Sequence, residues 1–312
     1  MLMRSFRTAL WISVLVFLPY YVGLHSELAF RLVDNFDSVI YGLLGVNVIV
    51  SWLLRSARDS IIYRYLGCPV RYGDVFVLNN QQLIINYLPM KLGTVHLATY
   101  LRNEFNFSYT SFAGAFFLQH VLISIVAAVS SFVAVAQFSG PDDRVSILLL
   151  VLFAILTALL VSVLLFEVRM SWLPDSVNRR LMAAHTQIRE FSRSARQFGS
   201  SLAISVGMYL LLVLRIYLLC LIFQFDVSWG AVVVFAGVSQ LSLFLAITPG
   251  ALGVREFFMG ALTSLFGFSA ATGVILSLAE RLVVLALSLV LFIFVASARQ
   301  IRAVSIGHGS NK

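Results

Sequence analysis

The sequence has 312 residues, of which 60% are hydrophobic and 12% are charged, and its mean hydropathy is +0.93. This composition excludes an ordinary water-soluble domain and indicates an integral membrane protein. A formal net charge of +8 could suggest a nucleic-acid partner. However, the basic residues lie in short segments beside apolar runs, as the positive-inside bias requires, so we expect no nucleic acid. Two cysteines in unrelated contexts, Cys68 and Cys220, indicate neither a disulfide framework nor a metal site.

Six apolar segments are predicted to cross the membrane. They are residues 9–24, 39–54, 107–138, 146–166, 200–223 and 270–296. No small-x-small cleavage site follows the first of them, so we interpret it as an uncleaved span rather than a signal peptide. The basic segments 55–74 and 167–197 are assigned to the inner side by the charge bias. The prediction is a multi-pass protein of the cytoplasmic membrane with both termini in the cytoplasm.

Two further apolar segments, 75–101 and 229–268, are interrupted by the same pattern, Pro-x-x-Leu-Gly. Proline removes a backbone donor and glycine loosens the chain, and in hydrocarbon the freed polar groups need protein or a water-filled cavity. Both segments are therefore predicted to be re-entrant helical hairpins, entering from opposite faces of the membrane. The residues predicted to break the helices are Pro89, Gly93, Pro249, Gly250 and Gly253.

Each predicted hairpin has one span before it and one after it, and the two sets have opposite orientation. The fold class is thus all-α, with about six transmembrane helices plus two re-entrant hairpins arranged as an inverted repeat, which is typical of alternating-access carriers. We expect a single transmembrane domain over 1–312. Its parts are 1–38 (first span and outer loop), 39–138 (first repeat, hairpin 75–101), 139–199 (connecting span and basic segment), 200–298 (second repeat, hairpin 229–268) and 299–312 (cytoplasmic tail).

The basic segment 167–197 has apolar residues at steps of three or four: Leu173, Val177, Leu181, Ala184 and Ile188. This spacing predicts an amphipathic helix on the inner leaflet. The alternative is a solvated basic loop that only fixes the topology.

Charged residues inside apolar segments are costly unless they are paired or hydrated. Glu280-Arg281 and Gln119-His120 occupy comparable depths in the spans that follow the two hairpins. One hypothesis is a cationic pocket for an anionic head group, with Arg215, Arg255 and Arg281 in one half. The full predicted substrate-binding set is Lys91, His96, Arg102, Arg215, Arg255, Glu256, Glu280 and Arg281.

The alternative is that Glu256–Arg281 and Glu280–Arg215 are internal ion pairs that hold the broken helices together. Asn86 and Gln119 are predicted to satisfy backbone groups freed in the hairpins. For His120, a packed and hydrogen-bonded side chain is favoured over the alternative of a proton carrier. No nucleophile, metal-ligand or phosphate-loop motif occurs, so we expect no enzyme and no cofactor or metal.

Four stretches carry a family resemblance: Asn86-Tyr-Leu-Pro-Met-Lys-Leu-Gly-Thr, Tyr100-Leu-Arg, Pro249-Gly-x-Leu-Gly-x-Arg-Glu256 and Glu280-Arg281. Over residues 52–298 the chain resembles the flippase-like family that includes the transmembrane region of lysylphosphatidylglycerol synthases. The resemblance implies a helical bundle with two re-entrant hairpins that moves aminoacylated phospholipid between leaflets.

The chain departs from that family in two motifs. The first hairpin lacks a Gly-Gly-Asp-like form, and Gln119-His120 stands where relatives often have an acid-Arg pair. No aminoacyl-transfer domain follows within these 312 residues, so we expect no lipid aminoacylation in cis. The chain is more similar to stand-alone members that serve envelope glycolipid or polysaccharide assembly.

The leading hypothesis is a flippase for an anionic lipid or a lipid-linked sugar, of phospholipid or polyprenyl-phosphate type, with membrane lipids as its partners. The second hypothesis is a non-transporting partner or regulator of an envelope glycosyltransferase. A membrane-embedded transferase is a third, and the absence of an Asp-x-Asp pair disfavours it. The sequence gives no oligomeric state.

Overall fold

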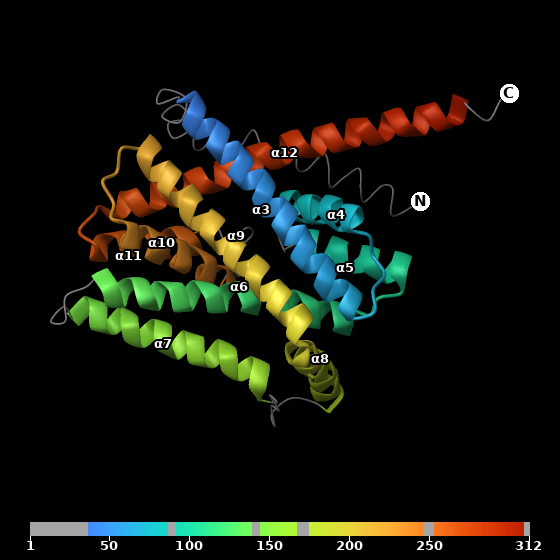
Figure 1. Ribbon diagram of the computed structural model, residues 1–312, viewed down its shortest axis with the longest axis horizontal. Helices are drawn as coiled ribbons and strands as arrows, with labels where there is room; N and C mark the ends of the chain where they lie inside the picture. Colours follow the sequence, from blue (N-terminus) through green and yellow to red (C-terminus); the bar gives the residue numbers. More distant parts are fainter. Residues whose placement is uncertain (1–36, 87–91, 139–143, 167–174, 246–252, 309–312) are drawn as a thin grey trace.

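The computed structural model describes residues 37–86, 92–138, 144–166, 175–245 and 253–308, and every regular element in these ranges is a helix (Figure 1). Five helices are long and apolar enough to cross a membrane: Ser38–Tyr65, Tyr109–Gln137, Arg144–Leu165, Ala195–Ile222 and Ala270–Phe294. They coincide with five of the six predicted spans. The first predicted span, 9–24, lies outside the described residues.

Two helices of equal length each begin one half of the described bundle. α3 (Ser38–Tyr65) and α9 (Ala195–Ile222) each contain 28 residues and pack against each other (Figure 1). The Asn47 side chain of α3 donates from Nδ2 to the Leu211 carbonyl of α9 at 2.9 Å. Asp37 caps α3, because its carboxylate accepts from the backbone N–H of Val39 at 2.8 Å.

Each of these two helices is followed by short helices and then by a long one. After α3 come α4 (Tyr72–Ile85), α5 (Leu92–Phe105) and α6 (Tyr109–Phe138). After α9 come α10 (Trp229–Leu241), the 3₁₀ turn η2 (Ser242–Leu245), α11 (Val254–Leu265) and α12 (Ala270–His308). α4, α5, α10 and α11 have 14, 14, 13 and 12 residues. At about 1.5 Å per residue each is shorter than the roughly 30 Å hydrocarbon layer.

The packing repeats in the same way as the order of the helices. The contacts α3–α4, α4–α5 and α5–α6 have the counterparts α9–α10, α10–α11 and α11–α12. The halves also exchange partners, because α4 packs on α12 and α10 packs on α6. In Figure 1, α4 and α5 lie to the right and α10 and α11 to the left. The two halves therefore share helix order, approximate helix lengths and contacts.

Glycine permits the closest helix approaches. A Cβ atom on Gly93 of α5 would overlap the Gln82 carbonyl of α4, and one on Gly273 of α12 would overlap the Met259 carbonyl of α11. Gly253 precedes α11 with φ of +83°, a conformation that disfavours other residues. In each half, one short helix thus packs closely against its neighbour because the neighbour has a glycine at the contact.

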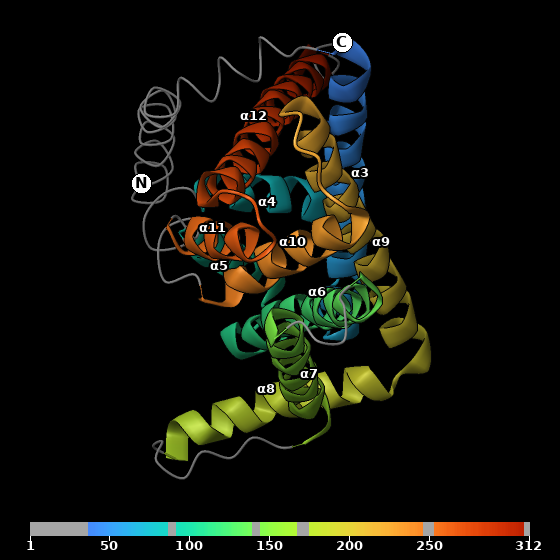
Figure 2. The same ribbon diagram turned by 90° about the vertical axis from the view of Figure 1, so that its left-hand side faces the viewer.

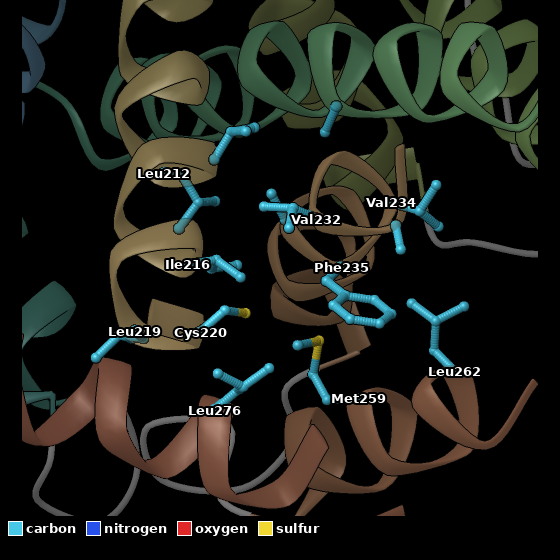
Figure 3. Packing of buried hydrophobic residues seen from close by; sticks show 14 of the residues in the cluster. Leu212, Ile216, Leu219, Cys220, Val232, Val234, Phe235, Met259, Leu262 and Leu276 are labelled. Carbon is cyan, nitrogen blue, oxygen red and sulfur yellow. The ribbon is translucent and has the colours of Figure 1, made fainter. Parts of the chain in front are cut away.

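The larger apolar cluster joins α9 to α10, α11 and α12 (Figure 3). Leu212 and Ile216 of α9 face Val232 and Phe235 of α10, and Leu276 of α12 closes the cluster. A second cluster fills the first half and includes Ile188 and Phe191. Both clusters hold the helices that carry the buried charges described below.

The remaining helices, α7 (Arg144–Leu165) and α8 (Asp175–Arg193), connect the halves (Figure 2). The helix predicted in 167–197 is confirmed, and the alternative of a solvated loop is wrong. α8 packs on the bundle as well as presenting a surface, because Ile188 and Phe191 are buried. Of the predicted apolar stripe, Leu181 is exposed, as is its neighbour Met182.

Candidate functional site

A cavity of about 330 Å³ lies between the two halves of the bundle. Residues of α3, α4, α5 and α6 line it from one half, and residues of α9 to α12 line it from the other. Four arginines and one glutamate face it, together with His120. The polar and charged lining residues are Ser51, Arg55, Gln82, Asn86, Thr94, His120, Arg215, Ser239, Gln240, Arg255, Glu280 and Arg281.

Glu280 of α12 bridges two of these arginines. Its Oε1 accepts from Arg215 Nη1 at 2.8 Å, and its Oε2 accepts from Arg255 Nη1 at 2.8 Å. All three side chains are 9% exposed. One carboxylate therefore joins α9, α11 and α12 at the cavity wall.

Arg215 also reaches across to the first half. Its Nε donates to Asn47 Oδ1 at 3.1 Å, and its Nη2 donates to Ser51 Oγ at 3.1 Å, both on α3. The planar guanidinium can make these bonds together with the ion pair because its donors form a rigid fork. The Arg215 guanidinium on α9 thus bonds to α3 and to the Glu280 carboxylate of α12 at the same time.

Glu256 serves the second broken segment in a different way. Its Oε2 accepts from the backbone N–H of Gly253 at 2.7 Å, which satisfies a donor at the start of α11. Its Oε1 accepts from Ser277 Oγ at 3.2 Å and pairs with Arg281 Nη2 at 3.3 Å. Glu256 is therefore a capping and pairing residue, and its partner Arg281 lines the cavity.

A second charged cluster lies on α3 and α4. Asp59 is fully buried; its Oδ1 accepts from Arg58 at 3.0 Å, and its Oδ2 accepts from Asn79 Nδ2 at 2.9 Å. Arg55 pairs with Asp59 Oδ2 at 3.6 Å and donates to Gln82 Oε1 at 2.9 Å. Arg55 lines the cavity with its side chain 26% exposed, so the first half also supplies a cation.

The two halves carry these charges at matching helix positions. Gln119-His120 are the eleventh and twelfth residues of α6, and Glu280-Arg281 are the eleventh and twelfth of α12. Arg58 and Arg215 are likewise each the twenty-first residue of their helices. The repeat is thus symmetric in position but not in charge, because the acid of α12 has a neutral counterpart in α6.

The structure brings together some predicted substrate-binding residues and separates others. Arg215, Arg255, Glu280 and Arg281 all border the cavity. Arg102 does not line it, and its guanidinium instead lies 5.5 Å from the centre of the Tyr109 ring, on the exposed side of α5. The half-buried His96 does not line it either. Lys91, Pro89, Pro249 and Gly250 lie outside the described residues.

The predicted support residues also have definite positions. Asn86 Oδ1 accepts from the backbone N–H of Thr94 at 3.1 Å, at the start of α5. His120 Nδ1 lies 2.8 Å from the Phe116 carbonyl of its own helix. Gln119 is 3% exposed within α6 and does not line the cavity.

Sequence reasoning missed Arg55 as a cavity residue. The predicted span ended at residue 54, and the charge bias assigned Arg55 and Arg58 to an inner segment, yet α3 continues to Tyr65 and Arg58 is buried. The predicted span stops too early, because acidic and amide partners on α3 and α4 compensate the charges of both arginines within the helix. The i, i+4 spacing of Arg55 and Asp59 was the available signal.

An all-helical membrane bundle with a positively charged cavity between two similar halves is the class that the structure defines. The chain belongs to the family described as lysylphosphatidylglycerol synthase TM region, whose family model matches residues 7–292. No curated protein and no solved structure matches the chain. The membership confirms the resemblance drawn from the sequence motifs.

Proposed function

We propose that this protein moves a lipid with an anionic head group between the leaflets of the cytoplasmic membrane, in the assembly of envelope lipids or glycolipids. The observation that carries the proposal is the excess of arginine over glutamate, four against one among the described residues, in the wall of a cavity between the two halves. Buried charges are expensive in a membrane unless they are compensated. A phosphate is a suitable counter-charge, because guanidinium groups bind it through paired hydrogen bonds.

In this proposal α4–α5 and α10–α11 are the two re-entrant hairpins, and they enter from opposite faces. The helices of both hairpins are too short to span the membrane on their own, and each hairpin is followed by a long helix, α6 or α12. The exchange of partners, α4 with α12 and α10 with α6, gives each hairpin a contact in the other half. Rocking of one half against the other would then expose the cavity to each side in turn.

A transport role is also favoured over catalysis by the state of the acids. The buried carboxylates in the described part of the chain are Asp59, Glu256 and Glu280, and all three are engaged by arginine. A carboxylate whose oxygen atoms already accept from arginine is poorly placed to accept a proton from a substrate. We therefore assign these groups to holding the cavity rather than to proton transfer.

The experiment reconstitutes the full chain in phosphatidylcholine vesicles containing fluorescent phosphatidylglycerol and measures its movement between leaflets. Arg55→Gln removes a cavity cation whose side chain is partly exposed; a lost charge-assisted hydrogen bond of about 1.5–3 kcal/mol would slow transport at least tenfold. Arg102→Gln, which removes an exposed cation away from the cavity, is the matched control. Equal rates for wild type and Arg55→Gln would refute the assignment of the cavity.

A double variant tests the other half of the cavity. Arg255→Ala with Arg281→Ala should abolish transport, and its folding is checked by size-exclusion chromatography and circular dichroism. If this variant does not fold, Arg281→Lys provides the second measurement, because it keeps the charge but loses the bidentate geometry. Transport that persists in every folded variant would contradict the proposal.

A docking role remains a second candidate function because α8 exposes Leu181 and Met182, at 41% and 40%. Under this hypothesis α8 would bind an envelope glycosyltransferase. Transferase activity that co-purifies with the wild type and is lost with Leu181→Asp, but not with Arg55→Gln, would favour it.

A further inference from the structure

We infer that the cavity accepts phosphate head groups that carry no ammonium and rejects aminoacylated or other amine-bearing ones. This inference rests on the proposed function and names the substrate class of the same cavity. Its basis is that the carboxylates described at and behind the cavity wall are already paired with arginine.

An ammonium ion in a buried site needs acceptors, and a carboxylate is the strongest that a protein offers. Glu280, the acid that lines the cavity, has one arginine nitrogen at 2.8 Å on each of its oxygens. Glu256 and Asp59, which lie behind the lining, are also paired with arginine, at 3.3 and 3.0 Å. An incoming ammonium would have to displace an arginine from one of them.

The remaining lining opposes a cation. Arg55, Arg215, Arg255 and Arg281 all border the same space, and like charges repel strongly where water is scarce. Two of the neutral acceptors already accept hydrogen bonds from the protein: Gln82 Oε1 from Arg55, and Asn86 Oδ1 from the Thr94 backbone. A phosphate meets the opposite conditions, because its oxygens accept charge-assisted hydrogen bonds from the guanidinium groups that line the cavity.

Among the described residues, the first half supplies no second acid to the cavity wall. The residue of α6 that matches Glu280 in helix position is Gln119, and the next residue, His120, is the one that lines the cavity. The hairpin segments 87–91 and 246–252 contain neither aspartate nor glutamate in their sequence. The charge asymmetry between the halves is therefore what excludes an amine.

The test uses the full chain in detergent with three short-chain lipids: phosphatidylglycerol, phosphatidylethanolamine and lysyl-phosphatidylglycerol. Binding is measured by the fluorescence of Trp52, which lines the cavity, and Trp52→Phe controls for signal from the other tryptophans. We expect phosphatidylglycerol to bind at least about tenfold more tightly than both amine-bearing lipids. Phosphatidylethanolamine separates the effect of the amine from the bulk of the lysyl ester.

Gln240→Glu supplies a gain-of-function variant, since it places a carboxylate of nearly equal shape in the cavity wall. In this variant, the ratio of the affinity for phosphatidylglycerol to the affinity for each amine-bearing lipid should fall several-fold. Transport of the same three head groups in vesicles is measured in parallel.

Equal or tighter binding of lysyl-phosphatidylglycerol, or no binding of any of the three lipids, would overturn the inference. Selective binding of phosphatidylglycerol without transport would support the inference and count against the proposed function. Transport of all three lipids at the same rate would leave the proposed function standing and refute the selectivity.

Discussion

Glu280 and Arg255 lie 25 residues apart in the chain, and their side chains meet at 2.8 Å. This contact joins the last long helix, α12, to the short helix α11. Since the same carboxylate also binds Arg215 of α9, one acid holds three helices around the cavity. The stability of the second half and the charge of the cavity therefore depend on the same group.

Replacing Glu280 by glutamine should lower the stability of the protein markedly. The change leaves two buried arginines without their counter-charge, a loss of about 3–5 kcal/mol for a broken buried pair. Thermal unfolding of the purified chain in detergent measures the effect. In a double-mutant cycle with Arg255→Gln, the two losses should couple by about 0.5–3 kcal/mol; strictly additive losses would contradict the ion pair.

Alanine at Gly93 or Gly273 should destabilise the bundle by about 1–3 kcal/mol, because each new methyl group would overlap a backbone carbonyl of the neighbouring short helix. The matched control is Gly45→Ala in α3, where a Cβ meets no atom within 4 Å. There the substitution should be neutral or stabilise by about 0.5–1 kcal/mol through helix propensity. The order of melting temperatures checks the prediction, and the same response at all three positions would count against close helix packing.

Asn86→Ala should loosen the start of α5. The substitution removes the acceptor of the Thr94 backbone N–H, a capping loss of about 1 kcal/mol. Amide hydrogen exchange should rise over residues 92–96 while exchange in α9 stays unchanged. Asn86→Asp keeps the acceptor and serves as the control; if it exchanges as fast as the alanine variant, the capping contact is not responsible.

Truncation of Phe191 tests how α8 is attached. Phe191→Ala should cost about 3–5 kcal/mol, because the ring is fully buried in the cluster of the first half. Met182→Ala on the exposed part of the same helix should change stability by less than about 0.5 kcal/mol. Similar losses for the two variants would indicate that α8 is not docked by this face.

Much of the fold could be predicted because its main signal is local. Long apolar runs determine spans wherever the surrounding solvent is hydrocarbon, and five predicted spans coincide with long apolar helices. The Pro-x-x-Leu-Gly patterns lie at the starts of short helices for a similarly local reason: proline restricts the backbone and glycine loosens it. The prediction that Gly93 breaks a helix is wrong, because it is the second residue of α5, whereas Gly253 directly precedes α11. The repeat was visible as well, since it appears in the order and spacing of these same segments.

Which charges meet was decided by the tertiary structure. The sequence placed Arg215, Glu256, Glu280 and Arg281 in apolar surroundings and left pocket and ion pair as alternatives. Packing pairs all four, and all of them except Glu256 also line the cavity. The tertiary structure also placed Arg55, which follows the predicted span, in the cavity wall and left Arg102 outside it. The physical reason is that hydropathy is a sum over neighbours along the chain, while the compensation of a buried charge depends on side chains that folding brings from other helices.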